Sequence, residues 1–213
     1  MEELVCYNEY KVFFLGKTFS LMGEVLRLSK LEGILAYNDK FVRRKEYMPY
    51  QTGKYPGDKI LVVTCMDTRL LELLPKAMNL QNGDAKVVKT AGALITSPYG
   101  SVMRSILVGV SLLAVEEIFV IGHHDCGMIG LESGTVLERI KQMGVKQEDL
   151  DSVYDQGVDV EKWLCGCGKV EEGVMQSVRM IRNHPLFPSN IPVHGLVIDP
   201  NTGKLDEVVR GYE

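Results

Sequence analysis

Residues 59–65 read Lys-Ile-Leu-Val-Val-Thr-Cys, a short apolar run rich in β-branched side chains. An apolar run of this length is typical of a strand that is buried on both faces of a parallel sheet. Similar runs follow at 85–89, 117–122 and 193–199. The chain therefore predicts several buried strands of one sheet.

Segments with helical periodicity lie between these runs. Apolar residues recur at intervals of three or four over 69–80, 101–115, 131–143 and 170–183. Alternation of strands and helices predicts an α/β fold, with a mainly parallel sheet flanked by helices. The segment 101–115 is so uniformly apolar that we expect it to be buried all round or partly covered by another subunit.

The C-terminal part departs from this alternation. A turn-forming segment, Asp-Pro-Asn-Thr-Gly-Lys at 199–204, precedes the apolar-containing run 205–209. This pattern predicts an antiparallel edge strand near the C-terminus. The polar, glycine-containing segment 144–169 is expected to form a surface excursion rather than a linker between domains.

Length and composition favour one domain. The chain has 213 residues, of which 46% are hydrophobic, enough for one sizeable core. We expect residues 1–30 to be an N-terminal extension of uncertain role. Residues 31–213 are then a single domain that begins with an amphipathic helix over 31–46.

Charge and hydropathy disfavour two classes of partner. The formal charge of −4 arises from intermixed acids and bases, and no basic run offers the phosphate contacts that nucleic-acid binding needs. No window reaches about 18 uninterrupted apolar residues, and the first residues, Met-Glu-Glu-Leu, are acidic where a secretory signal is basic. We therefore expect no nucleic-acid or membrane partner and a cytoplasmic location.

Three residues stand out as metal ligands. Cys65 ends the first predicted strand, and His123 and Cys126 follow the strand at 117–122. Open α/β sheets bind ligands at the carboxyl ends of their strands, so the three meet if the two strands are neighbours. Thiolate and imidazole are ligands that zinc prefers, and three protein ligands are typical of a catalytic rather than a structural site. A single strand-end cysteine is more often a buried small hydrophobe, but three such residues together favour Zn²⁺.

The other histidines and cysteines are weaker candidates. His124 competes with His123, although its position further from the strand suggests a solvated or supporting residue. We expect His184 and His194 to be structural. Cys165 and Cys167 lie in the polar excursion, where a single intervening glycine is poor spacing for a metal knuckle. Cys6 has no visible partner.

The motifs Cys-x-Asp-x-Arg at 65–69 and His-x-x-Cys at 123–126 together resemble the β-class carbonic anhydrases, in particular the small prokaryotic members. The similarity extends from about residue 32 to the C-terminus. One departure is at Thr90 and Ala93, where many members carry Asn. The resemblance implies reversible hydration of carbon dioxide by zinc-bound hydroxide, and a homodimer or higher homo-oligomer with residues 31–50 as an exchanged arm.

Asp67 and Arg69 are the expected catalytic pair. Zinc with two thiolates and a neutral imidazole has a formal charge of zero, so it acidifies water less than a site with three histidines. Arg69 can hold Asp67 ionised and aimed at the nucleophile. The resemblance also implies that Asp67 can turn to the fourth zinc position and close the site. We expect the backbone of Ala91 and Gly92 to form a wall of a small apolar substrate pocket.

Three other functions remain open from the sequence. The same scaffold could hydrolyse carbonyl sulfide or carbon disulfide, which are linear and apolar like carbon dioxide. A permanently closed site would make the chain a non-catalytic zinc-binding protein. A nucleophilic cysteine at position 65 is disfavoured, because a phosphate cradle needs a longer loop before its arginine.

Overall fold

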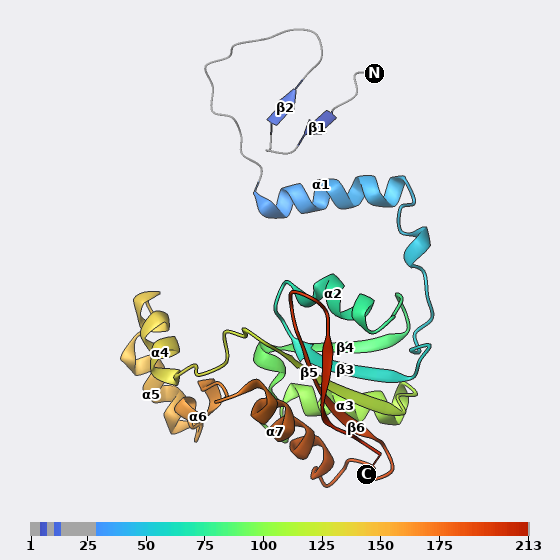
Figure 1. Ribbon diagram of the computed structural model, residues 1–213. Helices are drawn as coiled ribbons and strands as arrows, with labels where there is room; N and C mark the ends of the chain where they lie inside the picture. The colour runs from blue at the N-terminus through green and yellow to red at the C-terminus, as the bar shows by residue number, and fades with distance from the viewer. Residues whose placement is uncertain (1–4, 8–10, 14–28, 213) are drawn as a thin grey trace. The chain divides into compact units, whose positions relative to one another are not determined.

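The computed structural model describes residues 5–7, 11–13 and 29–212, which belong to two units that meet in sequence between Gln51 and Thr52 (Figure 1). The first unit contains an antiparallel strand pair, a helix and a 3₁₀ turn: β1 (Val5–Tyr7), β2 (Lys11–Phe13), α1 (Lys30–Arg43) and η1 (Met48–Tyr50). The predicted amphipathic helix is confirmed as α1, which begins at a capping box formed by Ser29 and Glu32. Most of the extension predicted at 1–30 lies outside the described residues, and a single domain over 31–213 stays a prediction.

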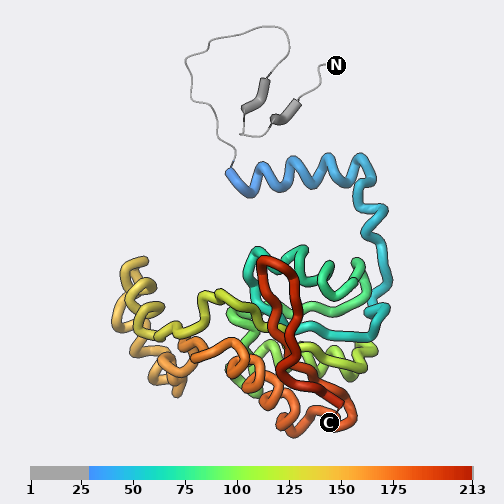
Figure 2. Tube along the Cα trace, in the orientation of Figure 1, coloured from blue at the N-terminus to red at the C-terminus, as the bar shows by residue number. Residues whose placement is uncertain are grey.

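The second unit is built on a five-stranded sheet with the order β4-β3-β5-β6-β7. Its strands are β3 (Ile60–Cys65), β4 (Ala85–Thr90), β5 (Glu117–His123), β6 (Val193–Ile198) and β7 (Leu205–Val209). The first four pair in parallel, and β7 pairs antiparallel with β6. The predicted α/β fold with an antiparallel edge strand near the C-terminus is confirmed, and the final hairpin is red in Figure 2.

The position of a strand in the sheet decides its burial. Every residue of β3 is buried, as predicted for a strand covered on both faces. The strand predicted at 85–89 is confirmed as β4, but its predicted burial is wrong, because β4 is an edge strand with no fully buried residue, and its Val87 is 51% exposed. Strand order, which the apolar run does not encode, accounts for the difference.

Helices cover both faces of the sheet. Helices α3 (Ser101–Leu112) and α7 (Val170–Arg182) pack on one face, and α2 (Leu70–Ala77) packs on the other. Helix α3 is not buried all round within the chain, because only Met103, Ile106 and Gly109 are buried and Leu112 is 69% exposed. Its cover by another subunit stays a prediction.

The segment before α7 contains three short helices. They are α4 (Ser133–Gln142), α5 (Gln147–Asp155) and α6 (Val160–Leu164), and they lie together beside the sheet in Figure 1. The predicted surface excursion at 144–169 is thus largely helical. Among the described residues, no helix has the length and apolarity needed to cross a membrane.

Gly195 of β6 allows α7 to approach the sheet closely. A Cβ atom at this position would lie 2.7 Å from Val174 Cγ1 and 3.3 Å from Val178 Cγ2. We therefore expect Gly195→Ala to lower the free energy of unfolding by about 1–3 kcal/mol through overpacking. Val174→Ala in the same chain removes the nearest contact and should recover part of that loss. Urea denaturation of both single variants and the double variant checks this, and strictly additive losses would contradict it.

Candidate metal centre

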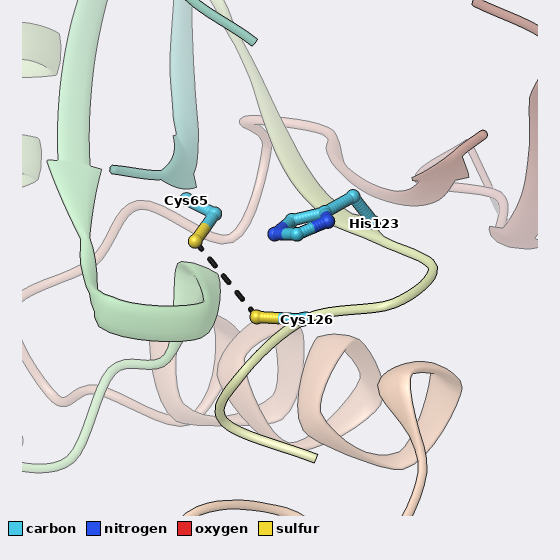
Figure 3. A group of neighbouring side chains, drawn as sticks. All are labelled: Cys65, His123 and Cys126. Carbon is cyan, nitrogen blue, oxygen red and sulfur yellow. Dashed lines mark hydrogen bonds between the residues drawn. The ribbon is translucent and has the colours of Figure 1, made fainter. Parts of the chain in front are cut away.

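Two neighbouring parallel strands bring the predicted ligands together. Cys65 is the last residue of β3 and His123 the last of β5, and these strands pair with Thr64 opposite Ile121. Cys126 lies on the loop that follows β5. Figure 3 shows the two thiols and the imidazole turned toward one another from the two strand ends and from this loop.

The spacing of the ligand atoms suits a tetrahedral metal. One ligand atom from each of Cys65, His123 and Cys126 lies within 4.8 Å of the others. The two sulfur atoms are 3.9 Å apart. Two sulfurs bonded to one tetrahedral zinc at about 2.3 Å would stand about 3.8 Å apart. The cluster therefore fits a zinc-sized ion with little rearrangement.

The imidazole of His123 is oriented for ligation. Its Nδ1 atom lies 2.8 Å from the backbone oxygen of His124, to which it donates as Nδ1–H. The neutral ring then carries its lone pair on Nε2, which is buried and has no hydrogen-bond partner among the described residues. A buried nitrogen without a partner is costly unless something else binds it, which fits a metal ligand.

The cysteines differ in their surroundings. Cys65 is buried, and the backbone N–H of Gly92 donates to its sulfur at 3.3 Å. Cys126 is partly buried, and that burial is the main cause that raises the pKa of its thiol to about 11. Without a metal this thiol is therefore protonated at neutral pH, and metal binding must release its proton.

The two residues predicted to line the substrate pocket lie in the 3₁₀ turn η2 (Ala91–Ala93), directly after β4. Ala91 is exposed, and Gly92 has a left-handed backbone with φ of 71°. A Cβ atom at Gly92 would come within 2.9 Å of the Met128 side chain. Both the backbone angle and the close approach require glycine at position 92.

Asp67 and Arg69 form a closely bonded pair beside the cluster. Arg69 donates to the Asp67 carboxylate from Nε, from Nη2 at 2.8 Å and from its backbone N–H at 2.8 Å. These bonds from Arg69 are the main cause that lowers the pKa of Asp67 to about 2. Asp67 Oδ2 also lies 3.8 Å from His123 Nε2, so an ionised carboxylate stands at the edge of the cluster.

Sequence reasoning missed one residue, Asp125. Arg69 Nη1 donates to Asp125 Oδ2 at 2.9 Å, and Arg69 Nη2 donates to the Asp125 backbone oxygen at 2.9 Å. The acid stands between two predicted ligands in His-His-Asp-Cys, which was the available signal. Arg69 thus joins the loops that carry the metal ligands.

The remaining histidines lie elsewhere. His124 is exposed, and the ring of His184 accepts the backbone N–H of Leu186. His194 stacks on Phe119 with ring centroids 4.8 Å apart, and its Nδ1 accepts the backbone N–H of Gly211. None of these three belongs to the metal cluster.

The segment 144–169 contacts the loop after β5, which carries Cys126, at Cys167. Its backbone N–H donates to the Met128 oxygen at 3.0 Å, and its own oxygen accepts from Gly130 at 2.8 Å. Gly166 permits this approach, since a Cβ atom there would fall 1.8 Å from the Met128 oxygen. Cys165 donates instead to the backbone oxygen of Lys162 at 3.2 Å. The side chain of Cys6 lies outside the described residues.

These features define an α/β protein with a three-residue centre for a soft metal ion at the carboxyl edge of a parallel sheet. The family profile described as carbonic anhydrase matches residues 60–205. The chain belongs to the β-class carbonic anhydrase family.

Individual relatives of the chain are also carbonic anhydrases or related hydrolases by name. YvdA of Bacillus subtilis (strain 168), which is named provisionally as a carbonic anhydrase, is 54% identical over 88% of this chain and 95% of its own length. The crystal structure of a β-carbonic anhydrase, isoform I, from Trichomonas vaginalis has a TM-score of 0.78 and 35% identity, covering 87% of this chain and all of that one. A carbon disulfide hydrolase of Acidithiobacillus thiooxidans is 29% identical over 73% of this chain and 79% of its own length.

The arrangement predicts one bound metal ion per chain. Metal-free protein titrated with Zn²⁺ should bind one equivalent, whereas Cys65→Ser should reduce the affinity by at least 10-fold, because a thiolate ligand is lost. Cys165→Ser is the matched control and should bind like the wild type. Metal analysis by mass spectrometry after dialysis gives the stoichiometry, and retention of a full equivalent by Cys65→Ser would contradict the assignment.

Proposed function

We propose that this protein is a zinc enzyme that catalyses the reversible hydration of carbon dioxide to bicarbonate and a proton. The observation that carries the proposal is the Asp67 carboxylate, which Arg69 holds 3.8 Å from His123 Nε2, an atom without a hydrogen-bond partner in the described part of the chain. Three thiol and imidazole ligands alone are typical of a catalytic metal, but they do not indicate which reaction it serves. An oriented carboxylate beside the cluster suits a reaction in which a water-derived nucleophile must be held in one orientation.

Cys65, His123 and Cys126 would hold the zinc ion. When bound there, zinc supplies a Lewis acid that makes water a nucleophile near neutral pH. The donor set fits this role, because its sulfur spacing of 3.9 Å and the free lone pair of His123 match zinc coordination. Two thiolates and one neutral imidazole balance the charge of the ion.

Asp67 orients the nucleophile. With its pKa lowered to about 2, its carboxylate is ionised throughout the physiological range and can only accept hydrogen bonds. A hydroxyl group that donates its hydrogen to Asp67 keeps its lone pairs directed away from the carboxylate and toward carbon dioxide. Arg69 fixes this acceptor through bonds to both carboxylate oxygens.

The turn at Ala91 and Gly92 is the proposed wall of the substrate pocket. Carbon dioxide is small and apolar, so it gains little from polar groups. Gly92 presents backbone rather than a side chain next to Cys65, and its N–H is already occupied by the sulfur. This leaves a compact surface suited to a linear molecule.

Hydrolysis of carbon disulfide or carbonyl sulfide is the second candidate. It is supported by the carbon disulfide hydrolase among the relatives, but that relative is far more distant than YvdA. We therefore favour carbon dioxide. Release of hydrogen sulfide from carbon disulfide by the zinc-loaded protein is the direct measurement of this alternative.

We further propose a cytoplasmic homodimer or higher homo-oligomer. A reducing compartment keeps the metal-binding thiols reduced. Exposed apolar side chains on α1 and α3, among them Ile34, Leu35 and Leu112, support burial against another copy. Residues 31–50 remain the proposed exchanged arm.

Replacing Asp67 should separate catalysis from metal binding. We expect Asp67→Asn to lower kcat for carbon dioxide hydration by about 100-fold or more, because the nucleophile loses its acceptor, while zinc content stays unchanged. Glu72→Gln removes an exposed carboxylate three residues beyond Arg69 and should behave like the wild type. Stopped-flow hydration checks this. A zinc-loaded wild type without activity at any pH would instead support a non-catalytic zinc-binding protein.

The rate should rise from pH 6 to pH 9. Zinc held by Cys65, His123 and Cys126 would ease deprotonation of water, so more nucleophile would be available as pH rises. An Asp67 carboxylate that had turned toward the metal would also be displaced more readily at high pH. Asp67 itself does not titrate in this window, because its pKa is lowered to about 2 and its charge is lost only in strong acid. Bicarbonate exchange measured across this range checks the profile, and a flat profile would contradict it.

A further inference from the structure

Arg69 is shared between two carboxylates. Nε and Nη2 face Asp67, whereas Nη1 donates to Asp125 Oδ2 at 2.9 Å. Nη2 also donates to the Asp125 backbone oxygen at 2.9 Å. A guanidinium presents its donors in a rigid plane, so acceptors at two edges of that plane fix its direction better than acceptors at one edge.

The backbone of Asp125 is shaped for this contact. Its φ of 53° lies in the left-handed region, which costs energy for most residues and is tolerated best by Gly, Asn and Asp. In this conformation the backbone oxygen and the carboxylate of one residue both accept from the same guanidinium. The left-handed conformation of Asp125 therefore coincides with two hydrogen bonds that it accepts from Arg69.

Asp125 is not itself a ligand of the metal cluster. The cluster consists of atoms from Cys65, His123 and Cys126. The Asp125 side chain is 84% exposed, and the bonded oxygen faces Arg69. The side-chain contact that links this carboxylate to the site is the one with Arg69.

We propose that Asp125 is a positioning residue that holds Arg69 across the two ligand loops and thereby keeps Asp67 aimed. The proposal rests on the function proposed for the Asp67–Arg69 pair. In this proposal, Asp125 positions Arg69 through the hydrogen bonds that it accepts, and its negative charge is not required. A side chain that keeps an acceptor oxygen should then replace Asp125.

Two substitutions separate geometry from charge. Asp125→Gly keeps the left-handed backbone but removes the side-chain acceptor, and we expect it to lower kcat about 3- to 5-fold with KM unchanged, the modest effect of an exposed ion pair. Asp125→Asn keeps an acceptor oxygen and should retain at least half of wild-type kcat. Asp206→Asn is the charge control, because Asp206 pairs with Lys204 outside the site. All variants should bind one zinc per chain.

A double-mutant cycle tests the route through Arg69. In an Arg69→Ala background, Asp125→Gly should produce no further loss of kcat, because the group it positions is absent. An equal 3- to 5-fold loss in both backgrounds would overturn the proposal. So would a loss in Asp125→Asn as large as that in Asp125→Gly.

Hydrogen exchange at Arg69 tests the positioning role of Asp125 without depending on catalytic activity. The ¹⁵N-coupled Nε–H resonance of Arg69, assigned by its absence in Arg69→Ala, should exchange with water several-fold faster in Asp125→Gly than in the wild type. Unchanged exchange would overturn the positioning role even if the enzyme is active. Wild type that is inactive toward carbon dioxide, with faster exchange in Asp125→Gly, would overturn only the proposed function.

Discussion

The parallel pairing of β3 with β5 is the constraint on which the metal centre depends. It places Thr64 opposite Ile121, so that Cys65 and His123 leave the sheet at the same edge. Both strands are largely buried, and a slip of one residue would turn every side chain to the opposite face. The packing that stabilises the sheet therefore also determines the distance between the ligands.

Much of this sheet could be predicted from the sequence. The strands and the helices α2, α3, α4 and α7 have strong periodicity, and their predicted positions agree with the structure within a few residues. Burial was harder to predict, since an apolar run does not show whether its strand lies at the centre or the edge. Val87 is exposed because β4 has a neighbour on one side within the chain. The apolar run of α3 likewise does not reveal how many of its faces the chain itself covers.

Part of the candidate site could also be predicted from the sequence, and part could not. Cys65, His123 and Cys126 could be identified from the sequence. Their residue types are those of zinc ligands, and their positions at or just after strand ends predict that they meet at the carboxyl end of the sheet. The place of Asp125 between two predicted ligands was a signal for the site, but its contact with Arg69 could not be predicted, because it depends on a left-handed backbone and on the direction of the Arg69 side chain. Nor could the contact of Gly166 with Met128, which joins segments that are separated by three helices. Tertiary geometry, rather than local pattern, determines both contacts.

Arg69 and its two carboxylates determine the formal charge beside the metal cluster. With zinc bound, two thiolates and a neutral imidazole leave the centre formally uncharged, while Asp67 and Asp125 outnumber the single cation Arg69 that they share. A surplus of one negative charge does not oppose the entry of neutral carbon dioxide. Arg69 donates to Asp67 through Nε and Nη2 and to Asp125 through Nη1, so its positive charge is shared between the segment after β3 and the loop after β5.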